Sequence, residues 1–214
     1  MSIMQEKLLS PGGALDQLAA MDKDIAAALE QYGPPPDRSL PASFETLARS
    51  ILGQQISRAA ASSIWNRMKD QACHTASVIA TKTPDEMMPL GLSRRKAEYL
   101  VGIASEIISG QLDLPNLATL TGEEVQVRLM TIRGIGAWTA NNYRLFALGD
   151  MDAWPFNDLA LQEGMKRLKG LAERPDGKIM QDMGTPWQPY RGAGALMLWH
   201  IYGILVRKAT IDEI

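Results

Sequence analysis

The chain has 214 residues, of which 46% are hydrophobic and 21% charged, as expected for a soluble globular protein with a substantial core. Its net charge of −2 argues against a broad basic surface that would hold nucleic acid. The single cysteine, Cys73, excludes a disulfide framework within the chain and a four-cysteine iron–sulfur cluster, and two histidines make a zinc site unexpected. We expect a cytoplasmic protein, because neither a signal peptide nor a membrane span is apparent.

Residues 1–12 are predicted to be a mobile lead, with a docked arm as the alternative. From Ala14 to Tyr32, apolar residues recur at helical spacing, which predicts one helix ended by Gly33 and the prolines after it. An amphipathic helix is predicted over residues 43–52. It is interrupted at Gly53-Gln54-Gln55, and another helix follows through Met68.

Thr83-Pro-Asp-Glu86 predicts a helix start with a capping box. A further helix is predicted from Gly91-Leu-Ser-Arg-Arg-Lys to Ile107, with Gly110 closing it. The basic residues at its start, Arg94 to Lys96, are either candidate phosphate contacts or part of an ordinary solvated face.

The central segment begins at Thr121-Gly-Glu-Glu124, a capping box that predicts a short helix running toward Gly134. Gly134 and Gly136 are predicted to end it and to leave the amides at the start of the next helix, near Ala137 to Ala140, accessible to an anion. A structural helix end followed by a second glycine is the alternative.

Asn157-Asp158 is predicted to open another helix that continues through Leu168. Arg174-Pro-Asp-Gly177 indicates a surface turn, and Trp187 to Tyr202 indicates a turn into a closing helix. No alternating strand pattern is present, so the predicted fold class is all-α.

The segment Leu129-x-x-Ile132-x-Gly-Ile-Gly-Ala-Trp-Thr-Ala, with an aspartate downstream at a helix start, resembles the helix-hairpin-helix (HhH-GPD) DNA glycosylases. Within them it is most similar to the 3-methyladenine DNA glycosylase II (AlkA/Mag-like) branch. Ile51-Leu-Gly-Gln-Gln-Ile-Ser57, the G-L-S-x-x-K-A segment from Gly91 and the W-x-P-x-R segment from Trp187 are similar to further elements of that family.

This resemblance implies a two-lobed helical fold with an active-site cleft between the lobes, in a compact form without the N-terminal β domain of some relatives. We expect residues 1–36 to form an arm and helix packed with the C-terminal lobe. Residues 37–150 would form a lobe with the wedge loop and the hairpin at about 121–145, and residues 151–214 would complete the second lobe.

The resemblance also implies a monofunctional N-glycosyl hydrolase that flips out and excises alkylated purines, such as 3-methyladenine and 7-methylguanine, in base excision repair. Asp158 would be the catalytic residue, because a carboxylate stabilises the oxocarbenium-like charge on the sugar. In the lyase branch a lysine follows the hairpin, and here Trp138 stands in its place, so no Schiff base and no strand cleavage are expected. The expected base pocket comprises Trp138, Trp199, Asn142, Tyr143 and Leu159.

For DNA binding, the resemblance assigns the wedge that fills the emptied duplex position to Gln55, with Gln54 as its neighbour; a solvated turn is the alternative. Backbone contacts are expected from Gly134, Gly136, Thr139, Lys96 and Arg94. The family resemblance implies a monovalent cation, Na⁺ or K⁺, on the carbonyls of Met130, Ile132 and Gly134; no other cofactor is expected.

The expected partner is double-stranded DNA containing damaged bases, bound by a monomer, in the nucleoid of a prokaryote or the nucleus of a eukaryote. Two alternatives stay open: a non-catalytic hairpin module that binds DNA, and a glycosylase for deaminated or other damaged bases.

Overall fold

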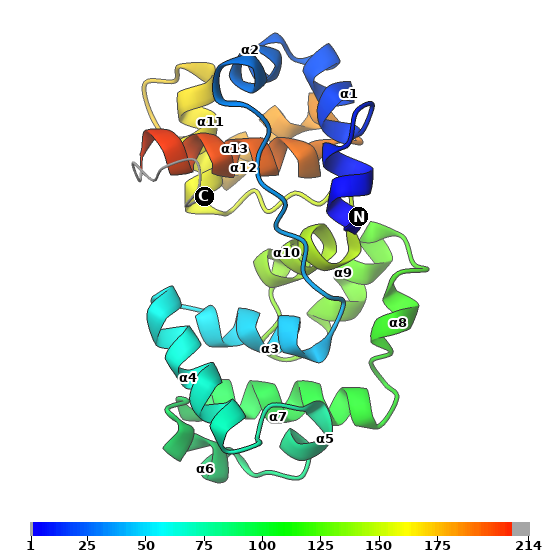
Figure 1. Cartoon of the computed structure of the whole chain (residues 1–214), viewed down its shortest axis with the longest axis vertical. Coiled ribbons are helices and arrows are strands. Elements are labelled where there is room, and N and C mark those ends of the chain that lie inside the picture. The colour runs from blue at the N-terminus through cyan, green and yellow to red at the C-terminus, as the bar shows by residue number, and fades with distance from the viewer. Residues whose placement is uncertain (1, 207–214) are drawn as a thin grey trace. The chain divides into compact units, whose positions relative to one another are not determined.

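The computed structural model describes residues 2–206, and within that range every regular element is helical, which confirms the all-α prediction. The chain divides into two compact units (Figure 1). Unit 1 contains the residues up to Ser39 and those from Arg144 onward, and unit 2 contains Leu40–Tyr143. The second boundary therefore lies at Tyr143, within a helix, rather than after residue 150 as expected.

The helices of each unit are as follows. Unit 1 has η1 (Gln5–Leu9, a π-helical turn), α1 (Ala14–Met21), α2 (Lys23–Tyr32), α11 (Leu159–Lys169), α12 (Gly177–Gly184), η3 (Thr185–Trp187, a 3-10 turn) and α13 (Arg191–Leu205). Unit 2 has α3 (Phe44–Gly53), α4 (Arg58–Asp70), α5 (Ala76–Ile79), α6 (Pro84–Met87), η2 (Met88–Leu90, a 3-10 turn), α7 (Arg94–Ile108), α8 (Leu114–Leu117) and α9 (Gly122–Met130). Helix α10 (Ala137–Leu148) begins in unit 2 and ends in unit 1.

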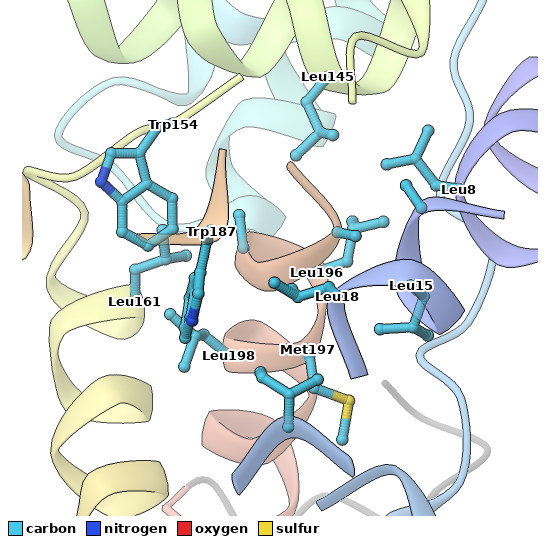
Figure 2. Close-up of a cluster of buried hydrophobic side chains, with 14 of the residues drawn as sticks. Leu8, Leu15, Leu18, Leu145, Trp154, Leu161, Trp187, Leu196, Met197 and Leu198 are labelled. Carbon is cyan, nitrogen blue, oxygen red and sulfur yellow. The ribbon is translucent and has the colours of Figure 1, made fainter. Parts of the chain in front are cut away.

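Helix α13 is the centre of unit 1. Its sequence is apolar on nearly all sides, and α11, α1 and α2 pack against it. Gly164 of α11 lies against the backbone of Leu198, so closely that a Cβ at this position would clash with it. Figure 2 shows side chains from α13 and its neighbours, among them Leu18 of α1 and Trp187 of η3, gathered in one buried cluster.

The N-terminal residues belong to this core. Met4 and Leu8 have no exposed surface, and Gly149 lies against the side chain of Ile3. The prediction of a mobile lead was therefore wrong, and the docked arm is correct for the part of it that the structure describes. Burial of two large apolar side chains provides the stabilisation that orders this segment.

Asp22 divides the predicted helix 14–32 into α1 and α2. Its backbone is extended, and its side chain accepts hydrogen bonds from the backbone N–H groups of Asp24 and Ile25, which makes it the N-cap of α2. The other carboxylate oxygen accepts from Lys169 Nζ at 2.6 Å and from Trp187 Nε1 at 2.7 Å. The break therefore places one carboxylate where it joins α2, α11 and η3.

In unit 2, α7 packs against α3, α5 and α6. The predicted starts of its helices are confirmed: Ser43 caps α3, Ser93 caps α7, and both Thr83–Glu86 and Thr121–Glu124 form capping boxes. Each cap satisfies backbone N–H groups that have no partner inside the helix.

Helix α12 is an element that the sequence did not predict. Asp176, interpreted as part of a surface turn, accepts a hydrogen bond from Ile179 N and caps this helix. Between residues 2 and 206, no helix has both the length and the apolar character needed to cross a membrane.

Candidate functional site

Asp158 is held at the start of α11. Its Oδ1 accepts hydrogen bonds from Ala160 N at 2.9 Å and Leu161 N at 3.0 Å, which confirms the predicted N-cap position. The carboxylate is partly exposed. The two backbone N–H groups fix the direction in which the carboxylate points.

Trp199 reaches the same carboxylate from α13. Its Nε1 donates to Asp158 Oδ1 at 3.1 Å, and its ring stacks on Phe146 with a centroid separation of 5.4 Å. Trp199 was predicted as a stacking surface in the base pocket. In unit 1 it orients Asp158, and one of its ring faces is already covered by Phe146.

The loop before Asp158 is fixed by an ion pair that the sequence did not indicate. Arg191, from the W-x-P-x-R segment, contacts Asp152 through Nε at 2.8 Å and Nη2 at 2.5 Å. Trp187 of the same segment is buried against Gly194. The segment thus joins α13 to the chain that leads into the candidate catalytic residue. Leu159, the residue after Asp158, is 62% exposed.

The hairpin lies between α9 and α10 in unit 2. Gly134 has φ +98°, a left-handed conformation that favours glycine, and a Cβ there would clash with the ring of Tyr99. The backbone at Gly136 is not left-handed, and nothing lies within 4 Å of where its Cβ would be. Gly134 therefore makes the turn, while Gly136 leaves an open approach to the start of α10.

The two glutamines of the loop between α3 and α4 differ. Gln54 Nε2 donates to Gly134 O at 3.1 Å and lies 3.3 Å from Thr139 Oγ1, so it joins this loop to the hairpin. Gln55 is exposed and has φ +59°, which is uncommon for a residue with a Cβ. Of the two, only Gln55 projects from the loop, in a backbone conformation of the kind found at functional sites.

Three further predicted residues lie on α10. Trp138 is 43% exposed, whereas Asn142 is 7% exposed and Tyr143 is 1% exposed. Burial raises the pKa of Tyr143 to about 12, so its phenol is neutral near pH 7. Within residues 2–206, the buried Asn142 amide and Tyr143 hydroxyl have no hydrogen-bond partner.

The two predicted phosphate contacts on α7 already have partners inside unit 2. Lys96 Nζ donates to Leu52 O at 2.7 Å, and desolvation lowers the pKa of its ammonium group. Arg94 forms an exposed ion pair with Asp85. Lys96 thus joins the end of α3 to the start of α7, a role that the sequence interpretation did not include.

A hollow of about 230 Å³ adjoins the loop between α3 and α4. Its lining includes Ile56 from the loop and the side chains of Arg49 and Arg58. Arg58 and Arg49, which is ion-paired with Glu45, place charged groups around this hollow. Sequence reasoning missed them because they are isolated in the sequence and fit no motif.

The hairpin carbonyls proposed for a monovalent cation are partly engaged. Ile132 O accepts from Ile135 N at 3.1 Å, and Gly134 O accepts from Gln54 Nε2. A carbonyl oxygen has two lone pairs, so these bonds leave each of them able to coordinate Na⁺ or K⁺. No cluster of His, Cys, Asp or Glu side chains that could hold a metal ion occurs in the described part of the chain.

Residues 48–189 match the model of the HhH-GPD superfamily base excision DNA repair proteins. A DNA-3-methyladenine glycosylase of Bacillus subtilis is 29% identical over 175 residues, which are 76% of this chain and 58% of that protein. The chain thus spans little more than half the length of that relative.

Two solved structures share the fold. One is a DNA-3-methyladenine glycosidase from Bacillus halodurans, with a TM-score of 0.80, 30% identity and 95% of each chain covered. The other is a 3-methyladenine DNA glycosylase from Schizosaccharomyces pombe in complex with abasic DNA, with a TM-score of 0.76, 29% identity, and 87% of this chain and 94% of that chain covered. The family match covers more than half of the sequence and includes both the hairpin and the capping aspartate, so the chain belongs to the HhH-GPD superfamily of base excision DNA repair proteins.

Proposed function

We propose that this protein is a monofunctional DNA glycosylase that extrudes alkylated purines, such as 3-methyladenine and 7-methylguanine, from duplex DNA and hydrolyses their N-glycosidic bond. The observation that carries the proposal is the carboxylate of Asp158, which caps the start of α11 and is oriented by the indole of Trp199. The names of the similar glycosylases support the same substrate class.

In the proposed reaction, the bond between the sugar and the damaged base breaks first, and positive charge develops on the sugar. Asp158 stabilises that charge and orients the attacking water, from which it accepts a proton. Alkylation at N3 or N7 makes the purine a cation that leaves without further protonation. The indole of Trp138 adds a cation–π contact of about 0.5–2 kcal/mol with such a base.

DNA binding is assigned to unit 2. Gln55 fills the position from which the base has left, and the amides at the start of α10 contact the backbone beside Gly136. Indole carries no nucleophilic amine, so Trp138 cannot form a Schiff base, and the product is an intact strand with an abasic site.

The decisive experiment is free-base release from methylated duplex DNA by wild type and Asp158→Asn. Asparagine is as good an N-cap as aspartate, so the variant should fold, while release should fall by about 10²- to 10⁴-fold. DNA binding should be retained, and wild type should not nick the abasic product.

Asp176→Asn is the matched control, because Asp176 caps α12 of the same unit in the same way. It should release bases at the wild-type rate. If Asp158→Asn is as active as wild type, or if wild type releases no alkylated base, the proposed function is wrong; retained DNA binding in the latter case would indicate a binding module.

A further inference from the structure

Asn142 is a buried side chain whose polar groups bind nothing within residues 2–206. It is 7% exposed, and neither Nδ2 nor Oδ1 has a hydrogen-bond partner in the described part of the chain. Its neighbour Asn141 behaves differently, because its Nδ2 donates to Ala137 O at 2.9 Å in the same helix. Leaving a buried amide without partners destabilises a folded protein, so such a group calls for an explanation, of which a bound ligand is one.

The position of Asn142 indicates what its partner is. Asn142 follows Trp138 by four residues in α10, so the two side chains lie on the same face of the helix, one turn apart. Trp138 is 43% exposed, and its side chain is a flat aromatic ring. A base that stacks on this indole lies one helical turn from the amide of Asn142.

An asparagine amide carries a donor and an acceptor side by side, the arrangement with which proteins recognise purine edges. 7-Methylguanine presents the O6 acceptor next to the N1–H donor, and 3-methyladenine presents N1 next to the N6 amino group. Since the amide can turn over, it complements both edges. In 1,N6-ethenoadenine the added ring joins N1 to N6, so no donor remains on that edge.

We propose that Asn142 reads the polar edge of the extruded purine through paired hydrogen bonds, which makes it a specificity-determining residue of the proposed glycosylase. This inference rests on the proposed function. It extends the substrate class to neutral purines with an adjacent donor and acceptor, of which hypoxanthine is the simplest, because the paired bonds do not require a positive charge. Purines whose edge is closed by a ring are discriminated against.

The test compares single-turnover excision of 7-methylguanine, hypoxanthine and 1,N6-ethenoadenine from matched duplexes by wild type, Asn142→Leu and Asn142→Ala. Leucine has the same number and branching of side-chain heavy atoms as asparagine without its polar groups, and alanine controls for its larger volume. Loss of a bidentate contact should slow release of 7-methylguanine and hypoxanthine by about 5- to 150-fold in both variants. Release of ethenoadenine should change by less than about 2-fold, since that base makes no paired contact.

Thermal unfolding gives a readout independent of DNA. If the amide has no partner in the free protein, Asn142→Leu should unfold at the wild-type temperature or above it. Asn141→Leu is the control, and its ratio of 7-methylguanine to ethenoadenine release should be that of wild type.

The inference is overturned if Asn142→Leu releases 7-methylguanine at the wild-type rate, if both variants slow all three bases equally, or if Asn142→Leu is clearly less stable than wild type. If wild type releases no ethenoadenine, the test rests on how the variants change the rate of 7-methylguanine release and the unfolding temperature. If wild type releases 7-methylguanine and the variants release it equally fast, this inference is contradicted but the proposed function is not. Wild type that releases none of the bases contradicts the proposed function as well.

Discussion

Two adjacent glutamines with the same side chain have different surroundings in this protein. Gln54 is bound to the hairpin through Gly134 O, whereas Gln55 is exposed with φ +59°. A left-handed backbone costs about 1–2 kcal/mol for a residue with a Cβ. Unit 2 tolerates this cost at the residue to which the wedge role is assigned.

Replacing Gln55 with glycine should therefore raise the free energy of unfolding by about 1 kcal/mol, because glycine adopts positive φ without the Cβ penalty. Base excision should fall, since no side chain is left to fill the duplex. Urea denaturation and single-turnover release of 7-methylguanine measure the two effects. Gln55→Ala, which keeps the Cβ, should lose excision without the gain in stability; a Gln55→Gly variant with full activity would contradict the wedge role.

For single residues, the sequence predicted the contacts that a residue makes with its near neighbours in the chain. The cap at Asp158 involves residues that follow it directly, and it was predicted correctly. The hydrogen bond from Trp199 joins residues 41 positions apart, and no local pattern indicates it. The sequence also could not predict that the amide of Asn142 lacks a hydrogen-bond partner in the described residues, because this depends on how the protein packs.

Among the elements, the loop after α3 and the hairpin are joined more closely than the sequence indicates. Gln54 binds both Gly134 O and Thr139 Oγ1, and Lys96 binds Leu52 O at the end of α3. The ring of Tyr99 packs on Gly134. Loop, hairpin and the start of α7 therefore form one connected assembly within unit 2.

Gln54→Leu should uncouple the loop from the hairpin. We expect weaker binding to duplex DNA containing an abasic site and slower excision, each by about 5- to 20-fold, from loss of hydrogen bonds worth about 1–2 kcal/mol in all. Fluorescence anisotropy and single-turnover kinetics measure these changes. Gln54→Glu is an informative companion, because a carboxylate cannot donate to Gly134 O and should be at least as harmful. Unchanged affinity in both variants would show that the coupling has no part in DNA binding.

The elements that sequence reasoning missed share a physical cause. The apolar spacing from Ala14 to Tyr32 continues across Asp22, so periodicity could not reveal the break between α1 and α2. Met4 and Leu8 are four residues apart, but their segment is too short to show a clear period, and burial orders them. Asp176 has the composition of a turn and caps α12 all the same.

Across the whole molecule, Asp22 links stability to pH. Burial alone raises the pKa of its carboxyl, but hydrogen bonds from Lys169, Trp187 and the Asp24 backbone outweigh that effect and lower it below 3.8. A lowered pKa in the folded protein means that stabilisation is present above the unfolded value and is lost as pH falls through the folded one.

We therefore expect the free energy of unfolding to decrease as pH falls below about 4, and Asp22→Asn to make that decrease shallower, because asparagine keeps the cap but does not titrate. Urea denaturation at several pH values between about 3 and 6 measures it. Parallel pH profiles for wild type and variant would contradict this role for Asp22.

The two units also differ in how the chain composes them. Unit 2 is one continuous stretch, Leu40–Tyr143, whereas unit 1 needs residues from both sides of it, such as Leu8 and Leu18 from before and Leu161 and Leu198 from after. During synthesis on a ribosome, the continuous stretch has all its packing partners as soon as it emerges. The N-terminal segment must wait with its apolar side chains exposed until α13 is translated, so the nascent chain is most vulnerable to chaperone capture and proteolysis during that interval.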